Sequence, residues 1–318
     1  MVGAWSFSSP VTLSRRTGVK LSHLIILLSM NFCWAAVYAV YKIIAIPTGA
    51  LVTLRFGLAG VCLLLAWPFL PGPSPRGRDL LLTGLMGVIT FTIGQRLQVY
   101  GNEIGTAGNS AVLMAMEPLV TSVAAALFLH EHIGPRRIAG FALGLAGVAM
   151  LHDVWRTDFR WVGTVPSLIF ISSFVCESAY SVIGKPIIAR ASVMKTLCLS
   201  LLIGTALNLI IDGSKTLLIA RQLPLASWAF LFALAIICTV VGYSLWFVVI
   251  RECPVNVAAL TIFAQAIFGV LIAAVWIRET PHLGQLLGSL TIAAGLVIGL
   301  SRQVKRATTP DAPSPTRE

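Results

Sequence analysis

The sequence predicts an all-α integral membrane protein of ten transmembrane helices, built as two inverted repeats of five helices each. Only 11% of its 318 residues are charged while 57% are hydrophobic, and the mean hydropathy is +0.88. A soluble domain carries about 25% charged residues, because most of its surface faces water. The polar residues here lie in short stretches between long apolar runs, and the two halves of the chain can be aligned. These observations favour a membrane protein with an internal repeat.

Ten apolar runs reach or approach the length that crosses a bilayer, whose apolar core of about 30 Å needs about 20 helical residues. The first run follows Arg15, Arg16 and Lys20, as a secretory signal would, but it is too long for one and is expected to remain as a helix. The run 135–152 is short, so nine helices is the alternative count. The expected segments are approximately 21–41, 47–70, 79–100, 105–129, 135–152, 163–185, 192–212, 226–250, 254–277 and 282–301.

Lysine and arginine residues predict the orientation, because they gather in the loops that stay in the cytoplasm. With the N-terminus inside, the inner segments hold fifteen of these residues and the outer segments hold six. We therefore expect a multi-pass protein of the cell membrane with both termini in the cytoplasm. In a bacterium this would be the inner membrane. The expected parts are a cytoplasmic N-terminal tail at 1–20, repeats at 21–152 and 153–301, and a disordered cytoplasmic tail at 302–318.

The internal repeat is visible when residues 110–147 are placed over 258–295, an offset of 148 positions without a gap. The most telling pairs are Glu131 with Glu279, Gly140 with Gly288, Gly147 with Gly295 and, at an offset of 143, Cys33 with Cys176 and Lys42 with Lys185. Because five is an odd number, the second repeat enters the membrane from the opposite side. Inverted repeats of this kind are typical of secondary transporters.

The first half of the chain contains Met116-Glu117-Pro118, Glu131, Gly140 and Gly147, and the second half contains Glu279, Gly288 and Gly295. Through these residues the chain resembles the EamA branch of the drug/metabolite transporter superfamily. The resemblance covers about residues 21–301. Gln265 and Ala266 stand where the family has a second Glu-Pro pair, so no role of that pair is carried over. The resemblance implies a ten-helix fold and transport of a small metabolite, without naming the metabolite.

Glu117 is a candidate functional residue, since it lies near the middle of the segment 105–129. A charged carboxyl group there costs about 2.5–3.5 kcal/mol to insert, and such a group usually faces a cavity or a partner. Thr121 shares its helical face, and Pro118 frees backbone carbonyl groups beside it. We expect Glu117 to face a substrate cavity. The alternative is a hydrogen-bonded glutamate that locks two helices together.

Two polar and aromatic stripes occupy matching positions of the two repeats. They consist of Glu177, Tyr180, Ser181 and Gly184 in the second repeat and of Asn31, Trp34, Tyr38 and Lys42 in the first. We predict that these stripes form opposite walls of one central cavity. The alternative is hydrogen bonding between packed helices.

Further polar residues lie inside the apolar segments. Arg55 could pair with Glu117, with Glu177 or with a substrate carboxylate, because a guanidinium group binds carboxylates in a bidentate manner. Gln95 and Gln98 could hydrogen-bond a substrate, whereas Arg96 could simply extend to the outer interface. The predicted substrate-binding residues are Trp34, Tyr38, Arg55, Gln95, Gln98, Glu117, Glu177, Tyr180, Tyr243 and Gln265.

Other classes of function find no support in the sequence. The six cysteines lack metal or disulfide spacing, and no nucleotide-binding or hydrolase motif is visible, so we expect no cofactor, metal ligand or catalytic residue. Basic residues at the ends of apolar runs favour lipid headgroups over nucleic acid. Glu131 and Glu279 are expected in exposed ion pairs with neighbouring arginines. The Gly-x3-Gly pairs are expected to serve helix packing or dimerisation.

The leading hypothesis is a secondary transporter that moves a small metabolite by alternating access between the repeats. Amino acids or related compounds are the expected substrates, export is favoured, and protons are a candidate coupling ion. The lipid bilayer is the other partner, and a homodimer is an option. The alternatives are an importer of another class, such as a sugar or nucleotide derivative, and a non-transporting membrane partner or sensor. An intramembrane enzyme is disfavoured, because His152 and Asp153 have no catalytic partner in the sequence.

Overall fold

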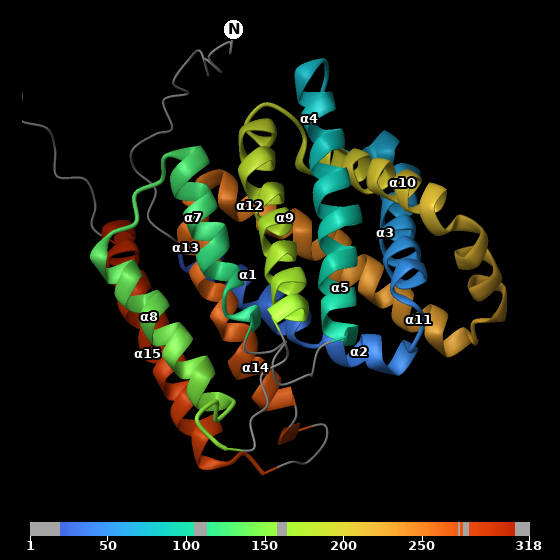
Figure 1. The fold of residues 1–318 in the computed structure, drawn as a ribbon. Coiled ribbons are helices and arrows are strands. Elements are labelled where there is room, and N and C mark those ends of the chain that lie inside the picture. Colours follow the sequence, from blue (N-terminus) through green and yellow to red (C-terminus); the bar gives the residue numbers. More distant parts are fainter. Residues whose placement is uncertain (1–19, 105–112, 158–163, 273, 276–279, 309–318) are drawn as a thin grey trace, which may run out of the picture.

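The computed structural model describes residues 20–104, 113–157, 164–272, 274–275 and 280–308, and its regular elements in these ranges are all helical (Figure 1). The α-helices are α1 (Leu21–Ala35), α2 (Val37–Ile44), α3 (Thr48–Leu65), α4 (Arg78–Gly87), α5 (Gln95–Ile104), α7 (Glu117–Leu129), α8 (Pro135–Leu151), α9 (Thr164–Ile188), α10 (Val193–Gln222), α11 (Leu225–Ala233), α12 (Gly242–Glu252), α13 (Val255–Leu260), α14 (Ala264–Ile272) and α15 (Leu283–Thr308). Between them lie the 3-10 segments η1 (Trp67–Phe69) and η4 (Thr261–Phe263) and the π-helical segments η2 (Val88–Gly94) and η3 (Leu234–Val241). The predicted all-α class is confirmed.

Seven helices in the described ranges are long and apolar enough to cross a membrane. Three of them are composite, since α4 continues through η2 into α5, α11 through η3 into α12, and α13 through η4 into α14. The protein is therefore a multi-pass membrane protein. The spans are Thr48–Leu65, Arg78–Gly101, Thr164–Ile188, Val193–Gln222, Leu225–Glu252, Val255–Ile272 and Leu283–Ser301.

The expected number of ten transmembrane helices is not established by these spans. The expected segment 21–41 divides into α1 and α2, because the chain turns at Ala36, and α8 has only 17 residues. The first part of the expected segment 105–129 lies outside the described residues, and α7 begins at Glu117. The count of ten stays a prediction.

Helix α10 is longer than the sequence predicts. The expected segment ended at residue 212, but the helix has 30 residues and ends at Gln222, so Lys215 is helical and not in an outer loop. Asp212 and Gly213 look like loop residues in the sequence. However, one glycine costs a helix only about 1 kcal/mol, and Asp212 is paired with Arg96. The helix ends just before Pro224, because the residue that precedes a proline is disfavoured in the helical conformation.

Residues related by the two sequence offsets make equivalent contacts. Thr90 of η2 donates a hydrogen bond to the carbonyl oxygen of Cys176 in α9 at 3.2 Å, and the Cys238 thiol of η3 lies 3.7 Å from the carbonyl oxygen of Cys33 in α1. Thr90 precedes Cys238 by 148 positions, and Cys33 precedes Cys176 by 143. The first helix of each half thus packs against the π-helical segment of the other half.

Helices α8 and α15 lie side by side along most of their length at one edge of the molecule (Figure 1). Glycines make this close approach possible: a Cβ atom on Gly147 would lie 2.7 Å from the carbonyl oxygen of Gly288, and one on Gly140 would lie 2.9 Å from that of Gly295. The paired glycines therefore serve packing within the fold.

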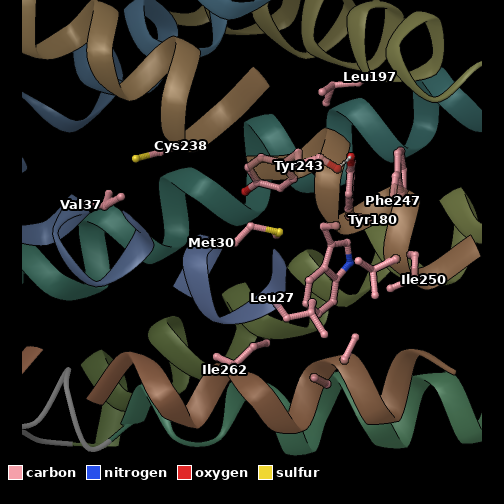
Figure 2. Close-up of a cluster of buried hydrophobic side chains, with 14 of the residues drawn as sticks. Leu27, Met30, Val37, Tyr180, Leu197, Cys238, Tyr243, Phe247, Ile250 and Ile262 are labelled. Carbon is pink, nitrogen blue, oxygen red and sulfur yellow. Dashed lines mark hydrogen bonds between the residues drawn. The ribbon is translucent and has the colours of Figure 1, made fainter. Parts of the chain in front are cut away.

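A cluster of buried side chains lies where α1, α9 and α12 meet (Figure 2). The ring of Tyr180 stacks on that of Phe247 with 4.0 Å between the centroids, and Tyr243 meets Tyr180 edge-on at 4.9 Å. Leu27 and Met30 from α1 complete this part of the cluster. The rings are held in one geometry, which matters because Tyr180 and Tyr243 also border a cavity.

Candidate substrate cavity

A cavity with an empty volume of about 700 Å³, including the space at its mouth, lies between helices from both halves of the chain. Its walls come from α1, α2, α3, α5, α7, α9, α12, η4 and α14. The lining residues are Trp34, Val37, Arg55, Gln95, Gln98, Met114, Glu117, Thr121, Glu177, Tyr180, Ser181, Tyr243, Trp246, Ile262 and Gln265. Side chains from both halves of the chain thus border one space.

Nine of the ten predicted substrate-binding residues line this cavity. They are Trp34, Arg55, Gln95, Gln98, Glu117, Glu177, Tyr180, Tyr243 and Gln265. Tyr38 belongs to α2, and its side chain lies outside the described residues. Of the two predicted stripes, Trp34 from the first and Glu177, Tyr180 and Ser181 from the second line the cavity, whereas Asn31 and Gly184 do not. The role of these residues in binding stays a prediction.

The cavity also contains residues that were absent from the predicted set. Trp246 lies one helical turn beyond Tyr243, so the helical period could have identified it. Ser181 was outside the list of binding residues, although it belongs to the predicted stripe that contains Glu177. Val37, Met114 and Ile262 carry no polar signal and could be found only from the structure.

Glu117 lies at the first residue of α7, and not in the middle of a continuous helix as expected. Pro118 explains this position, because its ring clashes with the carbonyl group four residues earlier and it has no N–H group to donate. The chain forms a turn at Ala115 and Met116 before α7 starts. The proline thus places a carboxyl group at a helix end that borders the cavity.

The equivalent place in the second half has a different side chain and a similar backbone irregularity. The 3-10 segment η4 immediately precedes α14, although Ala266 replaces the proline. Gln265 donates a hydrogen bond to the side-chain oxygen of Asn31 at 2.9 Å. Asn31 in turn donates to the hydroxyl group of Thr261 at 3.1 Å. Gln265 is therefore fixed to α1, and its amide is neutral where the first half has a carboxyl group.

Glu177 is held by a glutamine pair. The amide nitrogen of Gln95 donates hydrogen bonds to the Glu177 carboxylate and, at 3.3 Å, to the side-chain oxygen of Gln98. Gln95 and Gln98 are buried. The carbonyl oxygen of the Gln95 side chain is also buried and has no hydrogen-bond partner among the described residues. It remains available as an acceptor.

Arg55 is buried and uses its guanidinium group within the protein. It donates hydrogen bonds to the hydroxyl groups of Tyr41 and, at 3.0 Å, of Thr239. The group also lies over the Phe56 ring, 4.9 Å from its centroid. The proposed ion pair with Glu117 or Glu177 is not formed among the described residues.

Aromatic side chains form one wall of the cavity. The Trp34 ring lies 5.8 Å from Tyr243 and 6.1 Å from Trp246. Their polar atoms are directed at protein acceptors: the Trp34 indole donates to the carbonyl oxygen of Cys238, and the Trp246 indole to the hydroxyl oxygen of Ser181, both at 2.9 Å. The ring faces are therefore the groups that this wall offers to a ligand.

Two charged residues outside the cavity behave differently from the sequence prediction. Arg96, expected to extend to the interface, donates hydrogen bonds to Asn208 and Asp212 of α10. Glu131, expected in an exposed pair with a neighbouring arginine, is only 10% exposed and pairs with Lys185 at 2.8 Å. Glu279 lies outside the described residues.

The Glu131 carboxylate also caps the start of α13. It accepts hydrogen bonds from the backbone N–H groups of Val255 at 2.8 Å and Asn256 at 3.0 Å, and from the Asn256 amide at 2.9 Å. Arg137 donates to the side-chain oxygen of the same asparagine. These contacts could not be predicted from the sequence, since Glu131 and its partners in α13 are more than a hundred positions apart.

The helical fold, the membrane spans and a polar cavity shared by both halves define a multi-pass membrane transport protein. The model of the EamA-like transporter family matches residues 21–152 and 165–300. The chain belongs to this family, and the resemblance noted in the sequence is confirmed.

Two named relatives and one solved structure are distantly similar to the chain. The chain is 26% identical over 264 residues to the "Probable terminal-alkyne amino-acid exporter" of Streptantibioticus cattleyicolor, a match that covers 80% of this chain and 86% of the relative. It is 25% identical over 304 residues to the "Probable amino-acid metabolite efflux pump" of Escherichia coli K12, covering 91% and 96%. One solved crystal structure shares the fold with a TM-score of 0.72 and 18% identity, covering 91% of this chain and 99% of that one.

Proposed function

We propose that this EamA-type transporter is a secondary transporter that carries a small amphipathic metabolite through the cavity by alternating access. Amino acids or related compounds are the proposed cargo, and export is the favoured direction. The observation that carries the proposal is a cavity whose carboxyl, amide and aromatic side chains come from both halves of the chain. The printed names of two relatives, an amino-acid exporter and an amino-acid metabolite efflux pump, support the choice of cargo.

The second support comes from a polar network at the other end of the helices that border the cavity. Glu131 follows the end of α7, fourteen residues or about 20 Å along the chain from Glu117. Its contacts join α7 to α9 through Lys185 and to α13 through Asn256. We propose that this network closes the cytoplasmic side while the cavity is open to the other side. Alternating access requires that it separates in the opposite state.

The remaining expectations belong to the same proposal. Both termini lie in the cytoplasm, the division into repeats 21–152 and 153–301 marks the two moving units, and protons drive the exchange. The equivalent contacts of Thr90 and Cys238 support the division. The location in a bacterial inner membrane and a homodimeric assembly stay predictions.

Flux measurements test the proposal directly. The purified protein is reconstituted into proteoliposomes, and uptake of a panel of radiolabelled amino acids is followed with and without a pH gradient. We expect at least one compound to accumulate faster than in empty vesicles and to respond to the gradient. If no compound in the panel exceeds the empty vesicles, the proposed cargo is wrong.

A further inference from the structure

We propose that the carboxyl groups of Glu117 and Glu177 form a subsite for a protonated amine, and that a carboxylate on the transported compound is dispensable. This proposal rests on the transport function proposed above. It is narrower than transport of amino acids, because it predicts that simple amines with an apolar body bind as well.

Several hydrogen-bond donors of the cavity are used within the protein. Arg55 donates to Tyr41 and Thr239, Trp34 to the Cys238 carbonyl group, Trp246 to Ser181, Tyr180 to the Tyr243 carbonyl group at 3.1 Å, and Gln265 to Asn31. Two acceptors of the cavity have no donor among the described residues. Glu117 has no hydrogen bond or ion pair there, and neither has the side-chain oxygen of Gln95 a hydrogen-bond partner. A ligand that donates hydrogen bonds can therefore use the side-chain oxygen of Gln95 and the carboxyl groups of the cavity.

The charges of the cavity lead to the same conclusion. Glu117 and Glu177 line the same cavity, so two ionised carboxylates there repel one another. The guanidinium group of Arg55 makes hydrogen bonds to two hydroxyl groups and to neither carboxylate. Burying an uncompensated carboxylate in a membrane protein is unfavourable, and a bound ammonium group removes that cost.

The aromatic wall suits the remainder of such a ligand. Trp34, Tyr243 and Trp246 line the cavity that holds the carboxyl groups. An ammonium group is attracted by aromatic faces, and an apolar body gains by leaving water against them. The cavity therefore matches an amphipathic amine, with the charged end at the carboxylates and the apolar end at the rings.

A matched set of compounds tests the subsite. Each of three apolar groups, isobutyl, phenyl and indolyl, is represented by an amino acid, by the amine that lacks its carboxyl group and by the acid that lacks its amino group. The isobutyl compounds are leucine, isoamylamine and 4-methylpentanoate. The phenyl compounds are phenylalanine, phenethylamine and 3-phenylpropionate, and the indolyl compounds are tryptophan, tryptamine and indole-3-propionate. Binding to the purified protein is measured as a shift in melting temperature, and transport is measured in proteoliposomes. For at least one apolar group we expect the amino acid and the amine to bind and the acid not to bind.

Variants assign the effect to the carboxyl groups. E117Q removes the charge with little change of shape and is expected to weaken amine binding at least about tenfold, whereas E117D restores part of it. E103Q is the matched control, because Glu103 is an exposed glutamate that hydrogen-bonds Thr48 outside the cavity. Equal binding of acids and amines, or unchanged amine binding in E117Q, would overturn the subsite while transport itself persists. Absence of binding and flux for all nine compounds contradicts the transport function and the subsite together.

Discussion

At the scale of single residues, the hydrogen bond from Gln95 decides how Glu177 faces the cavity. Gln95 is buried, and its amide nitrogen donates a hydrogen bond to that carboxylate. A hydrogen bond to a charged group contributes about 1.5–3 kcal/mol, and a buried acceptor left without its donor loses that contribution. Gln95 is therefore a positioning residue for the carboxylate subsite.

Replacing Gln95 by leucine should impair transport more than folding. Without the amide, Glu177 is free to turn away from the cavity or to stay uncharged, so we expect flux in proteoliposomes to fall at least about tenfold. Gln222→Leu, at the exposed end of α10, is the matched control and should keep its flux. Normal flux in Gln95→Leu would show that the Gln95–Glu177 contact has no part in transport.

Sequence reasoning succeeds at this scale where a side chain shares a helical face with its neighbours. Glu177 and Tyr180 were placed in the cavity by their spacing alone. It fails where the partner is distant in the sequence. Arg96 reads as an interfacial residue until Asp212, 116 positions later, is brought beside it. Polarity and spacing contain no information about such pairs.

At the scale of elements, the π-helical segments η2 and η3 occupy equivalent places in the two halves. Gly94 is the last residue of η2, and Gly242 directly follows η3. Each glycine lets the first helix of the other half approach closely: a Cβ atom would lie 2.8 Å from the Cβ atom of Cys176 in the first case and 2.9 Å from the indole nitrogen of Trp34 in the second. The residues that follow them, Gln95 and Tyr243, line the cavity. Such π-helical turns occur frequently at functional sites.

Substituting either glycine by alanine should therefore separate the halves. We expect Gly94→Ala and Gly242→Ala to lower the melting temperature and the flux, because a methyl group has no room beside α9 or α1. Gly269→Ala in α14 is the control: its Cβ atom would meet nothing within 4 Å, and alanine favours a helix by about 1 kcal/mol. A melting temperature in either variant equal to that of the control would contradict the close packing.

The Glu131 network gives a second prediction for elements. Glu131→Ala leaves Lys185, whose side chain is 12% exposed, without its carboxylate and leaves the start of α13 uncapped. Removal of one partner of a buried ion pair typically costs about 3–5 kcal/mol, so a clear fall in the melting temperature is expected.

The exposed pair of Asp79 and Arg190 supplies the comparison, because Arg190 is 54% exposed and such pairs contribute about 0–1 kcal/mol. Asp79→Ala should melt close to the wild-type temperature. Equal losses in the two variants would mean that the Glu131 network stabilises the fold no more than a surface ion pair does.

At the scale of the whole molecule, hydropathy and charge were sufficient to predict an all-helical membrane protein, since both follow from composition alone. The number of spans was harder, because a break such as that at Ala36 leaves no mark in an apolar run. The offset of the halves predicted which residues would be equivalent, and the contacts of Thr90 and Cys238 agree with it. It could not indicate how the walls of the cavity close.

Alternating access is the central claim, and accessibility of the cavity from the two sides tests it most directly. Ser181 lines the cavity, and the six native cysteines are absent from its lining, so wild-type protein gives the background for Ser181→Cys. An impermeant trimethylammonium methanethiosulfonate is applied to right-side-out and inside-out vesicles. We predict that Ser181→Cys reacts from both sides and that bound amine slows both reactions. Reaction from one side only, under every condition, would contradict alternating access.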